Sequence, residues 1–156
     1  FANLRPVRVF DEVLDAAPLK PEILRGVDLV VVRELTGGIY FGRPSEQRQG
    51  AEGREAVDTL VYTEGEIARL LRAAFALARL RRRRLTSVDK ANILASSRLW
   101  REVAHEIRRD YPDVAYEDVL ADAMAMHLPR RAFQTWDGMF DQISAHTRFP
   151  PRHTPG

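Results

Sequence analysis

Cysteine is absent from the 156 residues, and lysine is nearly absent. Without cysteine the chain can form no disulfide, no zinc–thiolate site and no thiol nucleophile. Lys20 and Lys90 are the only lysines among 24 basic residues, so arginine supplies nearly all of the positive charge. Arginine suits bidentate recognition of carboxylates or phosphates, although GC-rich coding would produce the same composition.

Long hydrophobic runs are also missing. No stretch of about 18 apolar residues is present, so the sequence predicts no membrane span. The first ten residues, FANLRPVRVF, have no initiator Met and do not resemble a signal peptide, so they read like the middle of a longer protein. An apolar fraction of 45% and a net charge of +2 are ordinary for a soluble globular domain, and a cytoplasmic setting is compatible with the absence of cysteine.

Apolar runs alternate with helical patterns along the chain. Leu29–Val32 is a continuous apolar run that predicts a strand buried on both faces. Thr63 and Glu66 form a capping-box pattern before a helix with a wide apolar face, and Ile93–Arg109 predicts a second amphipathic helix. Further strands are expected at residues 7–10, 86–88 and 114–120, and another helix at 121–128. The alternation predicts an α/β fold with a central β-sheet flanked by helices.

Two segments lack such patterns. Residues 43–56 are polar and contain glycine, which favours an exposed loop or a protruding arm. From Pro129 the chain shows no clear period and ends in Pro, His, Arg and Gly. We therefore predict a main domain over residues 1–128 and a divergent, poorly ordered tail over residues 129–156.

Arg5 and Arg33 are the first candidate binding residues. Arg33 ends a predicted strand, and ligand sites in open α/β sheets gather at the carboxyl ends of strands. Two arginines converging there would hold a dicarboxylate, whereas the alternative is two surface arginines. Tyr40 follows a Gly-Gly pair and could pack in the core or donate a proton. Proton donation requires a nearby cation, for which Lys90 is a candidate unless this lysine is retained by chance.

Charged residues elsewhere are less specific. Asp122 lies at a strand–helix junction, where it could bind a hard divalent cation or cap a helix. Asp89 has a similar position. The run from Arg81 to Arg84 invites a nucleic-acid interpretation, but solvated cations that complement a helix C-terminus explain it better.

Taken together, four segments resemble the 3-isopropylmalate dehydrogenase family, whose relatives act on isocitrate, homoisocitrate and tartrate. The segments are FANLRPVRVF, DLVVVRELTGGIYFG, SVDKANIL and YPDVAYEDVLADAMAMHL, in that order and spacing. The resemblance covers residues 1–128, and the version RELTGGIYFG resembles the isopropylmalate branch.

The resemblance implies an NAD-dependent oxidative decarboxylation of 3-isopropylmalate to 2-oxoisocaproate in leucine biosynthesis. Arg5 and Arg33 would bind the malate carboxylates, and Tyr40 would protonate the enol intermediate. Lys90 would serve in a proton relay and Asp122 would bind Mg²⁺ or Mn²⁺, both acting in the site of the partner subunit. The resemblance therefore implies a homodimer, whose subunits exchange an arm formed in part by residues 43–62.

The chain also departs from the family pattern. The family's metal site needs two further aspartates, and only DGMFDQIS is present, in which Asp141 corresponds doubtfully to the first. The glycine-turn half-domain and the nucleotide-contacting region have no counterpart, so we expect the chain alone to be inactive. A non-catalytic dimerising module, a relative with another substrate, and a nucleic-acid binder remain as alternatives.

Overall fold

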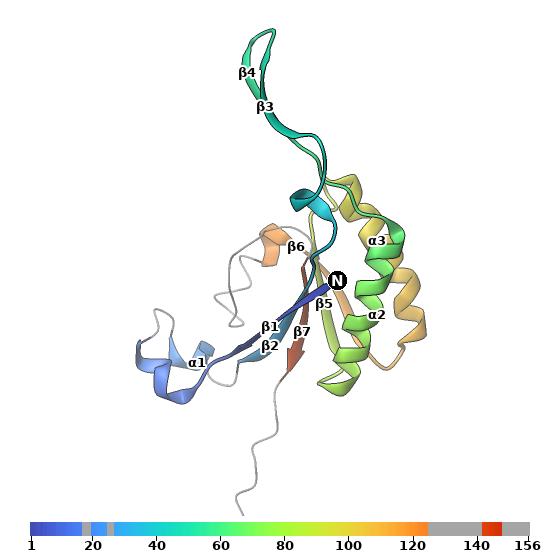
Figure 1. Ribbon diagram of the computed structural model, residues 1–156. Helices are drawn as coiled ribbons and strands as arrows, with labels where there is room; N and C mark the ends of the chain where they lie inside the picture. The colour runs from blue at the N-terminus through green and yellow to red at the C-terminus, as the bar shows by residue number, and fades with distance from the viewer. Residues whose placement is uncertain (17–19, 25–26, 125–141, 148–156) are drawn as a thin grey trace, which may run out of the picture.

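The computed structural model describes residues 1–16, 20–24, 27–124 and 142–147. Within these, five strands form the main sheet and two long helices cover one of its faces (Figure 1). In sheet order the strands are β1 (Ala2–Arg8), β2 (Asp28–Glu34), β7 (Gln142–Thr147), β5 (Arg84–Asp89) and β6 (Ala115–Leu120). The two covering helices are α2 (Glu64–Leu80) and α3 (Ala95–Ile107). A short helix, α1 (Pro21–Leu24), lies between β1 and β2 along the chain. Three 3-10 turns are Asp11–Ala16, Gly38–Tyr40 and Arg108–Asp110. The predicted α/β class is confirmed.

Helix α2 supplies more core residues than any other described element. Its start is the predicted capping box: the Thr63 side chain accepts from the Glu66 amide, and Glu66 accepts from the Thr63 amide at 2.8 Å. Its apolar face is fully buried against the sheet and α3. The core residues with the least exposure are Val32, Ile67, Leu70, Leu71, Ala74, Phe75, Ala78, Leu85, Trp100 and Ala104. Burying this face stabilises the helix more than its intrinsic propensity does.

Strand direction brings three strand ends to one edge of the sheet. Strand β5 is parallel to β6, and β7 is antiparallel to both β2 and β5, so β2, β5 and β6 run the same way. Strand β1 is antiparallel to β2 and therefore starts where β2 ends. We call the edge where β2, β5 and β6 end the carboxyl edge.

The predicted arm is a two-stranded hairpin that projects from the sheet (Figure 1). Strands β3 (Ser45–Gly50) and β4 (Gly53–Asp58) pair antiparallel across a two-residue turn. Arg48 donates to Glu55 across the hairpin at 2.6 Å. The expectation of a protruding arm at residues 43–56 is confirmed.

Several element boundaries differ from the sequence prediction. The first strand lies at Ala2–Arg8 rather than at residues 7–10, because its pairing with β2 begins at Ala2 opposite Glu34. Residues 121–124 are helical, and the rest of that predicted helix lies outside the described residues. In the predicted tail, residues 142–147 form a strand in the middle of the sheet. The prediction missed this strand because its residues show no clear apolar period.

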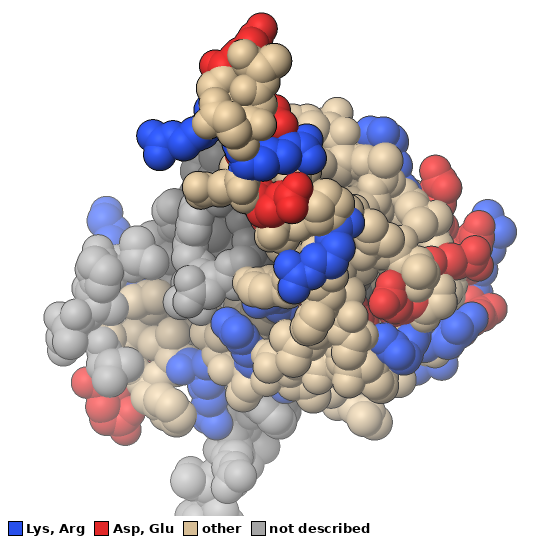
Figure 2. All heavy atoms as spheres, turned by 45° about the horizontal axis from the view of Figure 1, so that its top comes forward, with Lys and Arg blue, Asp and Glu red and all other residues tan. Residues whose placement is uncertain are grey.

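The arginine run is less solvated than predicted. Arg81 forms an ion pair with Asp28 at 2.5 Å, with its side chain only 18% exposed. On the face of the molecule that Figure 2 shows, basic side chains are interspersed with acidic and uncharged ones. Among the described residues no helix is long and apolar enough to cross a membrane.

Candidate active site

Arg33 and Tyr40 lie against each other at the carboxyl edge. The guanidinium carbon of Arg33 is 4.5 Å from the centre of the Tyr40 ring, a cation–π contact. Arg33 is 7% exposed, whereas Tyr40 is 62% exposed. The buried arginine thus holds a tyrosine whose hydroxyl-bearing ring remains open to solvent.

Arg5 lies on the same face of the sheet as Arg33. Asn3 is directly opposite Arg33, and Arg5 is opposite Val31, so alternation along the strands places these side chains on one face. Val32, whose side chain is in the core, points to the other face. Arg5 donates from Nε to the Asn3 side chain at 3.1 Å. The structure therefore places Arg5 and Arg33 on one face of the sheet.

Glycines make the turn between Arg33 and Tyr40 possible. Gly38 has a φ of 78°, and a Cβ there would lie 2.1 Å from the Tyr62 hydroxyl oxygen. A Cβ on Gly42 would lie 1.7 Å from the carbonyl oxygen of Thr59. The Gly38 amide donates to the Val61 carbonyl at 2.9 Å. Close backbone approach thus returns the chain toward the start of α2.

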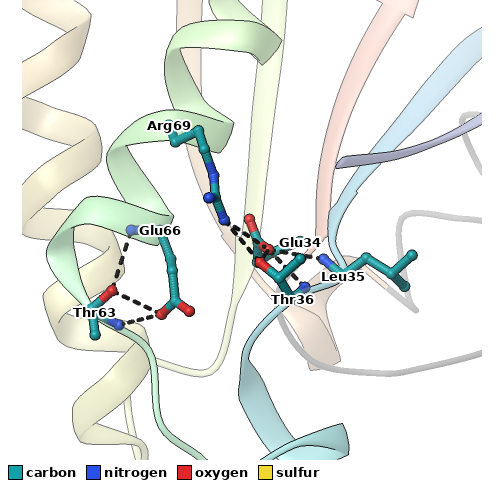
Figure 3. A network of polar contacts seen from close by, with 6 residues as sticks. All are labelled: Glu34, Leu35, Thr36, Thr63, Glu66 and Arg69. Atoms are coloured by element: carbon teal, nitrogen blue, oxygen red, sulfur yellow. Dashed lines mark hydrogen bonds and ion pairs between the residues drawn. The ribbon is translucent and has the colours of Figure 1, made fainter. Parts of the chain in front are cut away.

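A buried carboxylate fixes the start of this turn (Figure 3). Glu34 has a fully buried side chain, and its Oε1 accepts from the Leu35 amide at 3.1 Å and the Thr36 amide at 2.8 Å. Arg69 of α2 donates to the same oxygen at 3.4 Å. Neither Glu34 nor Arg69 was predicted to belong to the site. The signal was available in Glu34, because alternation places this charged residue on the core face of the strand.

Lys90 and Asp122, which were predicted separately as site residues, form a second pair. Their side chains make an ion pair, with Lys90 16% exposed and Asp122 64% exposed. Lys90 had been considered as the cation beside Tyr40, but within this chain Arg33 occupies that position. The side-chain hydroxyl of Ser97 accepts from the Lys90 amide at 3.2 Å. Lys90 therefore projects from a fixed backbone toward an exposed carboxylate.

The backbone before Lys90 is anchored by a buried ion pair. Asp89 is 1% exposed and accepts from Arg101 of α3 at 2.6 Å and from the Ala91 amide at 2.9 Å. The hydrogen bond with Asp89 raises the pKa of the Arg101 guanidinium above its ordinary value. Asp89 is thus a structural anchor for the Lys90 loop, and both of its oxygens are engaged.

Strand register relates the two pairs. Arg33 and Val88 are both opposite Gln142, so they lie in one row two strand spacings apart, roughly 10 Å. Lys90 follows Val88 by two residues, and Asp122 lies beyond the end of the neighbouring strand, β6. The two pairs therefore occupy the same edge but different strands.

The expected metal site is incomplete in the described residues. Asp122 is present, whereas Asp141 lies outside the described residues. No group of three His, Asp or Glu side chains able to hold a metal occurs in the described part of the chain. One carboxylate is too few ligands for Mg²⁺ or Mn²⁺, so the described residues do not by themselves fit the ion.

Another polar cluster lies between α3 and β6. Asp118 accepts from the Tyr116 hydroxyl at 2.6 Å and contacts the His105 Nε2 at 2.5 Å. Burial raises the pKa of the Tyr116 phenol above its ordinary value, and the hydrogen bond to Asp118 adds to the shift. This cluster was not predicted, and it packs the helix onto the edge strand of the described sheet.

Comparison with known proteins agrees with this geometry. A family model described as isocitrate/isopropylmalate dehydrogenase matches residues 1–138. The chain belongs to this family. It is 56% identical over 134 residues to a protein of Halalkalibacterium halodurans named 3-isopropylmalate dehydrogenase, covering 86% of this chain and 37% of that one. A Geobacillus kaustophilus protein of the same name is 52% identical over 149 residues, covering 96% and 39%.

Solved structures give the same result. The crystal structure of isocitrate dehydrogenase from Methylococcus capsulatus matches with a TM-score of 0.67 at 34% identity, over 83% of this chain and 38% of that one. The chain therefore spans little more than a third of the length of these isocitrate/isopropylmalate dehydrogenase relatives.

Proposed function

We propose that this chain supplies the substrate-binding and dimerisation part of an NAD-dependent, decarboxylating 3-isopropylmalate dehydrogenase of the cytoplasm. The observation that carries the proposal is the arrangement at the carboxyl edge. Arg33 contacts Tyr40 there, and Lys90 is paired with Asp122 just beyond the ends of the neighbouring strands β5 and β6. The names of the relatives support the choice of isopropylmalate as substrate.

The arginines bind and orient the substrate in this proposal. Arg33 is buried and offers a rigid guanidinium, which suits bidentate binding of a carboxylate. Arg5, on the same face, takes the second malate carboxylate. Orientation of the substrate by two such contacts removes much of the entropic barrier to reaction.

Tyr40 and Lys90 move protons. The Tyr40 hydroxyl donates a proton to the carbon that has lost CO₂, and the cation–π contact with Arg33 holds the ring in place. Lys90 serves, in the site of the partner subunit, in the proton relay that accepts the proton of the substrate hydroxyl. Its pairing with Asp122 orients the amine toward solvent, where a partner subunit would dock.

The cofactors are proposed from the family alone. NAD would accept the hydride, and a divalent metal would polarise the substrate oxygens. Asp122 would be one metal ligand, and Asp141 another. Because the described residues lack a complete ligand set, we derive no step through the ion.

The proposed homodimer rests on the hairpin. Strands β3 and β4 pair only with each other in the described structure, so each has a free edge on which a second hairpin could pair. Sedimentation equilibrium of the chain should give a dimer, and a variant in which residues 46–57 are replaced by a short Gly-Ser linker should give a monomer. A monomer in both cases would contradict the proposed dimer.

Turnover tests the catalytic proposal. In a chimera, residues 1–124 replace the aligned segment of the Geobacillus kaustophilus protein, and NADH formation is followed with Mg²⁺ present. We expect turnover of 3-isopropylmalate, and little turnover by this chain alone. A chimera that folds and dimerises but prefers isocitrate, homoisocitrate or tartrate would overturn the substrate assignment, and one with no turnover would overturn the catalytic assignment.

A further inference from the structure

We propose that Glu34, with Arg69 as its counter-ion, is a positioning residue that sets the contact between Arg33 and Tyr40. The inference rests on the proposed function only for the assignment of Arg33 and Tyr40 to the substrate. Glu34, Thr36 and Arg69 are here called the Glu34 network (Figure 3).

The Glu34 carboxylate binds the two residues that follow it in the chain. Glu34 is 3% exposed, and its Oε1 accepts from the Thr36 hydroxyl at 2.5 Å in addition to the amides of Leu35 and Thr36. Hydrogen bonds to a carboxylate are stronger than those between neutral groups. The carboxylate therefore fixes the direction of the chain over the two residues that follow β2.

Arg69 connects this turn to helix α2. Its Nη2 donates to the Thr36 hydroxyl oxygen at 2.8 Å, and that hydroxyl donates in turn to Glu34. The Arg69 guanidinium also lies 4.7 Å from the centre of the Phe1 ring, and the Phe1 carbonyl accepts from the Leu35 amide at 3.1 Å. The network thus joins the helix, the start of β1 and the turn.

The network acts on the site because Glu34 and Arg33 are consecutive. Their side chains point to opposite faces of the sheet, so a rotation of the backbone at Glu34 also turns Arg33. Further along, Thr36 leads directly into the Gly37–Gly38 turn that ends at Tyr40. Loss of the negative charge of Glu34 replaces the charged acceptor of the Thr36 amide by a weaker neutral one, which loosens this turn at its start.

Stability alone is a poor explanation for the network. Glu34 Oε2 is buried and has no hydrogen-bond partner among the described residues. A buried acceptor without a partner lowers stability, and a buried ion pair often stabilises no better than an apolar pair of similar size. The network instead holds a fixed negative charge at Glu34, next to Arg33, the residue that contacts Tyr40.

The test compares the geometry of the site with the stability of the fold. In the chain as it exists, NMR would measure the ring-current shift that Tyr40 imposes on the Arg33 side-chain protons, with Tyr40→Leu as the zero reference. Malate is the binding probe, and Tm is measured in parallel. The variants are Glu34→Gln, which keeps size and removes charge, and Arg69→Met. Arg72→Met is the matched control, because Arg72 lies one turn along α2, is exposed, and makes no hydrogen bond or ion pair with the described residues.

We expect Glu34→Gln and Arg69→Met to reduce the ring-current shift and weaken malate binding about tenfold, the loss of roughly one charge-assisted hydrogen bond. Arg72→Met should change neither. A lower Tm with the wild-type shift and affinity in both variants would overturn the proposal and leave a purely structural role.

Two further outcomes separate this inference from the proposed function. If the wild-type chain does not bind malate but the shift still falls in Glu34→Gln, the positioning role stands and the proposed substrate site fails. If Glu34→Gln does not fold, Arg69→Met decides, since the Arg69 side chain is 42% exposed and its truncation leaves the core intact.

Discussion

The Arg33 guanidinium lies over the ring of Tyr40 at 4.5 Å, although a Gly-Gly turn separates the two residues along the chain. The contact explains why an arginine, two glycines and a tyrosine occur within eight residues. The arginine ends a buried strand, and the glycines let the chain turn back so that the ring reaches it.

Tyr40→Phe should separate catalysis from stability. The ring and its contact with Arg33 remain, and the hydroxyl lost belongs to a residue that is 62% exposed. In the chimera we expect kcat to fall by about 10² or more, the usual contribution of a general acid, with little change in Tm. A variant with wild-type kcat would remove Tyr40 from the mechanism.

Two defective chains should complement each other if the site is shared between subunits. In mixed dimers of chimeras carrying Arg33→Met and Lys90→Met, one of the two sites has both wild-type residues. Random mixing should restore roughly a quarter of the wild-type activity, as two-fold symmetry requires. Absence of restored activity in dimers shown to be mixed would mean that each site uses residues of one chain only.

Arg101→Met should destabilise the fold strongly. The change leaves Asp89 buried with its charge unpaired, which typically costs about 3–5 kcal/mol. Urea unfolding measures the loss, and Arg72→Met is again the control. A loss below about 1 kcal/mol would contradict the anchoring role of the Asp89–Arg101 pair.

Glycine substitutions should have opposite effects at two sites. Gly42→Ala places a Cβ against the Thr59 carbonyl, and we expect a loss of about 1–3 kcal/mol or more from overpacking. Gly65→Ala meets nothing within 4 Å in the first turn of α2, so it should stabilise by about 0.5–1 kcal/mol. Equal effects in urea unfolding would contradict the close approach at Gly42.

The capping box should make stability depend on acid pH. Hydrogen bonds from the Thr63 amide and hydroxyl hold the pKa of Glu66 below its ordinary value. A carboxyl with a lowered folded-state pKa contributes stability that is complete above its unfolded pKa and lost as pH falls through the folded one. Thermal unfolding between pH 6 and 3 should therefore show a smaller decline for Glu66→Gln than for the wild type. Thr63→Ala should cost about 1 kcal/mol at neutral pH.

The sequence predicts some parts of this molecule better than others. Strong local patterns, such as the capping box at Thr63 and the apolar run of β2, predict elements that the structure contains. The positions of Arg33 and Tyr40 could be predicted only through resemblance, because spacing alone does not show that the chain turns back. Asp89 could have been a ligand by its position, but its partner Arg101 lies on another element. Such pairings depend on tertiary contacts that leave no local signal.

Strand β7 also affects how the fold can be assembled. It lies between β2 and β5, so the residues made before it form two separate strand pairs, β1–β2 and β5–β6. Helix α2 packs on both pairs, against β2 and against β5. During synthesis on the ribosome, Arg33 on β2 and the Lys90–Asp122 pair beyond β5 and β6 therefore cannot take their final spacing in the sheet until β7 has been made. Until then, the nascent chain exposes two unpaired strand edges that chaperones or other chains could bind.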